Sequence, residues 1–172
     1  MASNVPVASP GTSVRSSSEA FHGVGFTVGK EEFCVDILKV QEIIRMVPIT
    51  AMPNAPDYVE GVINLRGKII PVIDFRKRFH IFDGSDGDEE SRRIIVVSFG
   101  PVNVGIIVDK VSQVLKIGGE QISPTPDVVR GYDSDYIRGV ARVGERLIIL
   151  LELEQLFSQY GLDTLGSSSE AA

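Results

Sequence analysis

The sequence predicts an all-β fold with short helices, built from two small β-barrels packed side by side. Three observations support this prediction. Short apolar segments alternate with frequent turn signals, helical periodicity is scarce, and the second half of the chain repeats the first. Many short strands separated by turns favour barrels or sandwiches over a parallel sheet.

The predicted strands occur as hairpins, each pair joined by a short turn containing glycine. The Gly-first loop at 144–145 suits a type II′ turn. The hairpins are 26–28 with 33–37, 61–65 with 69–73 around 66–68, 94–99 with 104–108 around 100–101, and 140–143 with 147–151.

Helices are expected at two places. Asp74 can cap a short turn through Phe75 and Phe79. Residues 152–160 carry Leu153, Leu156 and Phe157 at helical spacing, followed by Gly161 as a C-terminal stop. The second pattern predicts a C-terminal helix over 152–160.

The internal repeat is an ordered set of matching features. Lys39-Val40 matches Lys110-Val111 at an offset of 71 (110 − 39), and the motif Y-x-x-G-V at Tyr58 matches that at Tyr136 at an offset of 78 (136 − 58). A proline-rich loop lies between the two features in each copy, at 52–56 and at 123–126. Duplication explains the shared order better than chance, and each unit of about 65 residues would have a marginal core alone.

The segments outside the repeats are polar. Residues 1–20 are predicted to be a disordered leader and 162–172 a disordered tail, and the acidic loop 83–91 separates the halves 21–82 and 92–151. Acidic glycine-rich loops can hold calcium, but the ligand spacing of a calcium loop is absent. We therefore predict no metal site here.

Composition narrows the classes of partner. The net charge of −6 and the lack of Trp argue against nucleic-acid binding. No apolar run approaches the roughly 20 residues that a membrane span needs, so no direct membrane insertion is expected. Cys34 is the single cysteine, which excludes an intramolecular disulfide and suits a buried apolar position.

The residue types used in catalysis are few and scattered. His22 and His80 are the two histidines, and with Cys34 they show no zinc-binding spacing. Asp36, Asp74 and Asp109 each lie at a strand end, where caps and turns are the expected roles. No nucleophile elbow, phosphate loop or dinucleotide motif is present. The sequence predicts a binding module, with no enzymatic activity, catalytic residue or cofactor.

Two charged residues lie in unusual surroundings. Arg66 is in the predicted hairpin tip 64–67, where it would present a forked cationic donor. Glu42 lies among apolar residues, and strand alternation would put Val40, Glu42 and Ile44 on one face. These residues could form a groove rim for an amphipathic helix, or an ordinary strand and a solvated turn. The residues alone do not separate these alternatives.

Several stretches together resemble the CheW family over residues 21–160. The run G-V-x-N-L-R-G-x-I-x-P-V-x-D at 61–74 is the most specific. The others are 32–43, 53–56, 105–109, 139–141 and 147–151. The resemblance implies two intertwined five-stranded SH3-like barrels, with exchange of terminal strands between them. Cys34 and His80 depart from the family, which usually has Gly at the first position and commonly at the second.

The family resemblance implies a non-enzymatic adaptor that couples chemoreceptors to the histidine kinase CheA. It binds the cytoplasmic tip of methyl-accepting chemotaxis receptors and the regulatory domain of CheA, and it is expected in the cytoplasm, recruited to receptor arrays at the inner face of the membrane. At 172 residues the chain leaves no room for kinase or receiver domains. A scaffold for another chemosensory kinase, controlling pili or gene expression, is the alternative. The receptor-binding positions carried over are Val40, Glu42, Ile43, Gly61, Asn64, Arg66 and Gly105, and the kinase-binding strands are marked by Ile94, Ile95 and Val104.

Overall fold

The protein is described here by a computed structural model covering residues 20–81, 88–123 and 136–155. Its regular structure is mostly β. The helical turns are η1 (Ile37–Lys39), α2 (Phe75–Arg78), η2 (Glu89–Ser91) and η3 (Gly119–Gln121). The strands are β1 (Phe21–Val28), β2 (Glu31–Asp36), β3 (Val40–Arg45), β4 (Val59–Leu65), β5 (Lys68–Asp74), β6 (Arg93–Phe99), β7 (Val102–Val108), β8 (Lys110–Ile117), β9 (Ile122–Ser123), β10 (Ile137–Val143) and β11 (Arg146–Leu151).

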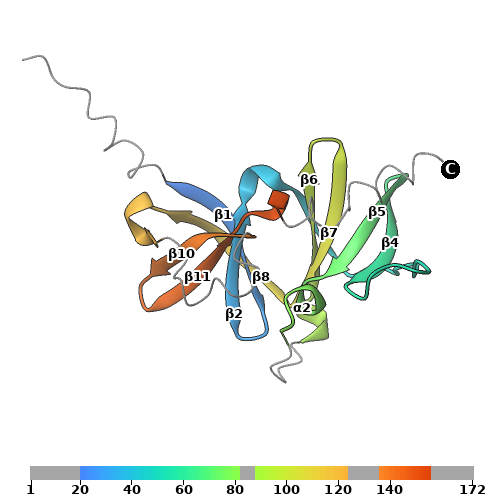
Figure 1. Cartoon of the computed structure of the whole chain (residues 1–172), viewed down its shortest axis with the longest axis horizontal. Helices are drawn as coiled ribbons and strands as arrows, with labels where there is room; N and C mark the ends of the chain where they lie inside the picture. Colours follow the sequence, from blue (N-terminus) through green and yellow to red (C-terminus); the bar gives the residue numbers. More distant parts are fainter. Residues whose placement is uncertain (1–19, 82–87, 124–135, 156–172) are drawn as a thin grey trace, which may run out of the picture.

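The strands form two sheets that lie side by side (Figure 1). Sheet A has the order β8-β1-β2-β11-β10-β9, and sheet B has the order β3-β6-β7-β5-β4. Each sheet closes on itself in the same way. The chain leaving β3 pairs with β4 through two hydrogen bonds of 2.9 Å between Thr50 and Val62, and the chain leaving β8 pairs with β10 through β9. The predicted fold class of two pseudo-symmetric barrels is confirmed.

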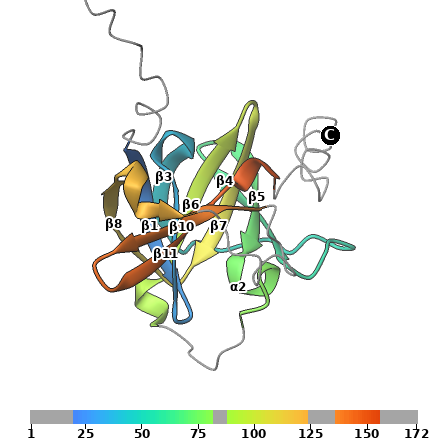
Figure 2. The ribbon, with the colours of Figure 1, turned by 60° about the vertical axis from the view of Figure 1, so that its left-hand side comes forward.

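The two sheets do not follow the two halves of the sequence. β1 and β2 join the later strands β8–β11 in sheet A, while β6 and β7 join the earlier strands β3–β5 in sheet B (Figure 2). The exchanged strands meet their sheets in parallel pairs, β2 with β11 and β5 with β7. The ranges 21–82 and 92–151 are therefore halves of the sequence and not single barrels.

The two copies share their irregularities as well as their strands. β4 has an extra residue between Val59 and Gly61, and β10 has one between Ile137 and Gly139, at the predicted offset of 78. In both copies the carbonyl of the tyrosine before the strand accepts a hydrogen bond from the residue at the end of the hairpin. Asp74 N–H donates to Tyr58 O at 2.8 Å, and Glu152 N–H donates to Tyr136 O at 2.6 Å. Matching bulges are preserved features of a fold, so they support duplication.

The described residues form three apolar clusters. One lies inside each barrel, around Ile117 and Ile148 of sheet A and around Ile94 and Val96 of sheet B. The largest lies between the sheets and contains residues of both, including an aromatic group. Within it the Phe33 and Phe75 rings are 4.7 Å apart in an edge-to-face arrangement, a geometry favoured by aromatic quadrupoles. The barrels thus share a core, as expected for units that are marginal alone.

A buried arginine lies between the two copies of the repeat. The Arg78 guanidinium carbon is 5.6 Å from the Tyr58 ring centroid and 5.0 Å from that of Tyr136, which are equivalent tyrosines. Cation–π contacts of this kind stabilise a buried cation. Arg78 therefore joins the two copies at their pseudo-symmetric boundary.

The short helix after β5 forms as predicted. Asp74 caps α2 by accepting a hydrogen bond from Arg76 N–H at 2.9 Å. Of the predicted C-terminal helix, residues 153–155 are helical and the remainder lies outside the described residues, as do the leader 1–19, the tail 162–172 and loop residues 82–87. Within the described ranges, no helix has the length and apolar character to cross a membrane.

Candidate interaction site

The orientation of Glu42 is set by a bulge in β3. Val40 is opposite Val97 and Glu42 is opposite Val96, so Gln41 is an extra residue. Val97 belongs to the cluster between the sheets and Val96 to the interior of barrel B. Val40 and Glu42 therefore point to opposite faces, and the prediction that they share a face is wrong. Alternation fails because the bulge adds one residue to the strand.

Arg66 lies at the tip of the β4–β5 hairpin with an unusual backbone. Arg66 and Gly67 have φ of 52° and 84°, the two positive values of a type I′ turn. Glycine adopts this region freely, whereas arginine does so at a cost of about 1 kcal/mol. The side chain of Asn64 accepts a hydrogen bond from Gly67 N–H at 2.9 Å and holds the turn closed.

Glu42 of β3 and Arg66 of the β4–β5 turn form an ion pair at one end of barrel B, the barrel formed by sheet B (barrel A is formed by sheet A). The end marked by this pair is called the mouth of barrel B. The Arg66 Nη1 to Glu42 Oε2 distance is 2.8 Å, and 78% of the Arg66 side chain is exposed against 21% of Glu42. The other carboxylate oxygen, Glu42 Oε1, is buried and has no hydrogen-bond donor among the described residues. An ion pair this exposed adds at most about 1 kcal/mol to stability. The pair is better suited to binding a partner than to stabilising the fold, because several N–H groups of the guanidinium are not bonded to Glu42.

The two glycines carried over to the receptor site have internal roles. Gly61 has φ of 148°, and a Cβ there would lie 2.0 Å from Thr50 O, so glycine lets the closing segment approach β4. Gly105 is buried, and a Cβ there would meet Ile94 Cγ2 at 2.8 Å. Neither residue contributes a side chain to a rim, and the placement of Gly105 at the rim is wrong.

Exposed apolar side chains also occur on the strands of barrel B that carry the ion pair, and in the segment after β3. Ile43 follows Glu42 in β3, and Ile69 is opposite Asn64 at the base of the turn, with 40% and 49% exposure. Met46, Val47 and Met52 are exposed in the segment that follows β3. Apolar surface around a fixed charge is typical of a protein-binding face. Of the predicted receptor residues, the structure pairs Glu42 with Arg66 and places Asn64 in the same turn. Ile43 is opposite Ile95 and therefore points to the other face of β3 from Glu42.

The three residues that mark the predicted kinase strands lie in the core. Ile94, Ile95 and Val104 have 0%, 1% and 0% exposure. A partner could not contact these side chains without opening β6 and β7, so they are wrong as contact residues. The prediction failed because β6 and β7 are central strands of sheet B, with neighbours on both sides. A continuous apolar run is typical of such buried strands.

Two exposed apolar residues on barrel A were missed. Val114 of β8 and Leu147 of β11 are each 59% exposed. They are the repeat equivalents of Ile43 and Ile69, at the offsets of 71 and 78. Applying the offsets to the candidate residues would have found them. Each barrel therefore exposes the same two apolar positions.

The ion pair itself is confined to one copy of the repeat. The equivalents of Glu42 and Arg66 are Gln113 and Gly144. Gly144 also has a positive φ, 64°, in a two-residue turn. Barrel A thus has the same turn position and the same apolar positions without the charges. The two barrels offer related but chemically distinct faces.

The acidic residues considered for chemistry have structural roles. Asp36 caps η1 by accepting from Leu38 N–H at 2.9 Å, and Asp109 accepts from Arg76 and from Gly29 N–H. Burial raises the pKa of the Cys34 thiol to about 12, with a smaller contribution from the Asp36 charge, so the thiol is a poor nucleophile. No group of His, Cys, Asp and Glu within the described ranges has a metal-binding arrangement.

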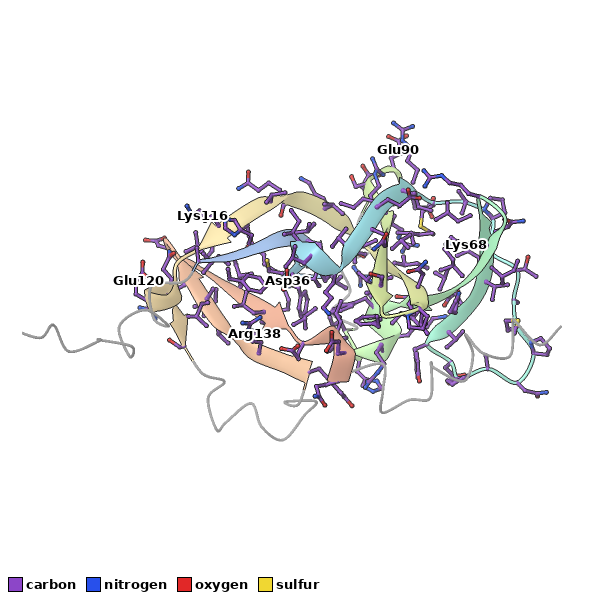
Figure 3. The ribbon with its side chains drawn as sticks, turned by 90° about the horizontal axis from the view of Figure 1, so that it is seen from above. Asp36, Lys68, Glu90, Lys116, Glu120 and Arg138 are labelled. Atoms are coloured by element: carbon purple, nitrogen blue, oxygen red, sulfur yellow. The ribbon has the colours of Figure 1, made fainter. Side chains whose placement is uncertain are left out.

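A hollow beside Asp36 has polar groups in its lining. It is lined by β1, η1 and β10 and contains Asp36 and Arg138. Asp36 is engaged as a helix cap, and the Arg138 guanidinium lies 5.2 Å from the Phe21 ring centroid. Figure 3 shows both residues well away from Lys68, which follows the Arg66 turn. The hollow is separate from the barrel B mouth.

Comparison with known proteins agrees with this architecture. The family model of the CheW-like domain matches residues 22–160. The chain is 45% identical to chemotaxis protein CheW of Klebsiella aerogenes over 133 residues, covering 77% of this chain and 79% of that protein. It is 35% identical to chemotaxis protein CheW of Treponema pallidum over 153 residues, covering 88% and 90%. The crystal structure of the scaffolding protein TtCheW from Thermoanaerobacter tengcongensis superimposes with a TM-score of 0.73 at 39% identity, covering 81% of this chain and 88% of that one.

Proposed function

Because this chain belongs to the CheW family of chemotaxis adaptor proteins, we propose that it joins chemoreceptors to the histidine kinase CheA through two separate faces. Proteins of this family are scaffolds and not enzymes. The function of the chain is therefore to couple components of chemotaxis signalling by binding them. The Glu42–Arg66 ion pair is the observation that supports the receptor face most strongly.

The proposed receptor face is the mouth of barrel B. The exposed Arg66 guanidinium provides hydrogen-bond donors, Glu42 holds it in place, and Ile43 and Ile69 of the strands that carry the pair add exposed apolar surface. An amphipathic helix can satisfy all three, with a polar residue on the ion pair and apolar residues beside it. The cytoplasmic tip of a chemoreceptor, a helical hairpin, is the partner of this kind that we assign to this face.

The proposed kinase face is on barrel A. Val114 and Leu147 are exposed apolar residues at the positions equivalent to Ile43 and Ile69, and the positions equivalent to Glu42 and Arg66 carry no charge there. We assign the regulatory domain of CheA to this face, in place of the buried residues of β6 and β7. One duplicated fold would then have two docking faces, of which only one carries the Glu42–Arg66 pair.

Separate faces are what an adaptor needs. If receptor and kinase bind at the same time, each contact raises the effective concentration of the other partner, and two weak contacts become a stable assembly. Signal transfer further requires that the contacts differ between the kinase-on and kinase-off states. An adaptor that binds both states with equal affinity cannot change the equilibrium between them. Recruitment of the chain to receptor arrays at the inner face of the membrane follows from the same binding.

Titration of the full chain with each partner separately tests the proposal. The partners are a receptor cytoplasmic fragment and the isolated CheA regulatory domain, and the dissociation constants are measured by calorimetry. We expect Arg66→Ala to weaken receptor binding alone and Leu147→Glu to weaken kinase binding alone. Lys68→Ala and Arg142→Ala are matched controls, because each is an exposed residue beside one substituted position. Equal weakening of both partners by either variant would contradict the assignment of separate faces.

A further inference from the structure

We infer that Asn64 is a positioning residue for Arg66 and does not itself contact the receptor. The inference rests on the proposed receptor face for its binding consequences, but its structural basis is independent. The family resemblance carried Asn64 over as a receptor contact, two residues before Arg66 in the motif. Its side-chain oxygen is instead engaged inside the turn, with Gly67 N–H at 2.9 Å.

Arg66 needs this support because its backbone is in the left-handed region. At φ of 52° the Cβ of a non-glycine residue is crowded, so the conformation persists only if other interactions hold it. The Asn64 bond closes the turn from the side chain across to Gly67. It holds the two residues between them, and one of these is Arg66, whose guanidinium pairs with Glu42.

The second copy of the repeat provides an internal comparison. There the residue equivalent to Arg66 is Gly144, which takes φ of 64° without crowding. The residue equivalent to Asn64 is Arg142, whose side chain has no hydrogen-bond acceptor. The copy with glycine at the strained position thus lacks the asparagine, and the copy with arginine has it. This pairing is expected if the asparagine compensates for the arginine.

Two measurements on the full chain test the inference. The first needs no partner. Nuclear magnetic resonance of the free protein gives the hydrogen-exchange rate of the Gly67 amide and the HN–Hα coupling of Arg66, which reports its φ. We expect Asn64→Ala to speed Gly67 exchange about threefold to tenfold and to change the Arg66 coupling. Asn64→Asp keeps an acceptor oxygen and should leave both close to wild type. Unchanged exchange and coupling in Asn64→Ala would overturn the inference.

The second measurement is a mutant cycle on affinity for the receptor fragment. If Asn64 acts through Arg66, Asn64→Ala weakens binding in the wild type but adds less than twofold, roughly, to the effect of Arg66→Ala. Independent losses that multiply in the double variant would mean direct contact and would overturn the inference. If Arg66→Ala leaves binding unchanged, the proposed receptor face fails, while the exchange and coupling data still decide the role of Asn64 in the turn.

Discussion

Arg76 and Asp109 form a two-bonded ion pair at the boundary between the two sheets. Arg76 Nε donates to Asp109 Oδ1 at 3.0 Å and Nη2 donates to Oδ2 at 2.5 Å, while Gly29 N–H also donates to Oδ2 at 2.8 Å. Arg76 belongs to α2, which follows sheet B, Asp109 joins β7 to β8, and Gly29 is the turn between β1 and β2 of sheet A. One carboxylate therefore ties elements of both barrels together.

Loss of the Asp109 carboxylate should destabilise the fold. The two side chains are only 15% and 10% exposed, so Asp109→Ala leaves a cation with little solvent in place of its partner. We expect a loss of about 2–4 kcal/mol in the free energy of unfolding, somewhat below that of a fully buried pair. Urea denaturation measures it. Glu32→Ala is the control, because its pair with Arg146 is exposed and should cost less than about 1 kcal/mol. Equal costs for the two variants would contradict the prediction.

The same pair predicts how stability depends on pH. Burial alone raises the pKa of the Asp109 carboxyl, but hydrogen bonds from Arg76 and Gly29 and the charge of Arg76 outweigh it, and the pKa lies below its ordinary value. A carboxyl with a lowered pKa contributes stability that is fully present above the unfolded value and is lost as pH falls through the folded value. The difference in unfolding free energy between wild type and Asp109→Asn should therefore be constant near neutral pH and shrink below about pH 4. Urea midpoints across that range measure it, and a difference independent of pH would rule it out.

The elements whose formation depends on residues close in the sequence were predictable from the sequence. Turns at Gly100 and Gly144 are short-range signals, and the Asp74 cap needs only the residues after it. The repeat offsets found equivalent strands. What local patterns could not show was pairing at a distance. The exchange pairs Thr27 of β1 with Lys110 of β8 and Glu32 of β2 with Ile148 of β11. Asp109 likewise meets Arg76 across 33 positions.

The candidate site was predictable in its charges and less so in its geometry. Glu42 and Arg66 were found as unusual residues, and their contact is in the structure. The face assigned to Val40 was wrong because a bulge has no clear signal in the residues around Gln41. Ile94, Ile95 and Val104 were misassigned because apolar composition does not tell a buried strand from an exposed apolar one.

The thiol of Cys34 should be unreactive until the protein unfolds. It is buried within barrel A, and its pKa of about 12 leaves almost no thiolate at neutral pH. With a colourimetric disulfide reagent at pH 8, we expect the native protein to react at least about 100-fold more slowly than the protein in urea. Lowering of the native rate by a stabilising osmolyte would show that reaction requires opening. Rapid labelling of folded protein would contradict the burial.

Exchanging the charges of Glu42 and Arg66 tests whether receptor binding needs only an ion pair between these positions or needs the cation at position 66. The variant Glu42→Arg/Arg66→Glu can restore attraction between the side chains, so its stability should stay within about 1 kcal/mol of wild type, because the tip position 66 is largely exposed. Receptor binding should not recover. The partner is expected to need the cation at the exposed tip, and a loss of about 1–3 kcal/mol is typical of a charged hydrogen bond removed from an interface. Calorimetry with the receptor fragment measures the binding, and denaturation of the same sample checks the fold. Wild-type affinity in the exchanged variant would mean that the pair acts only by bracing the mouth, and that Arg66 itself makes no contact with the receptor.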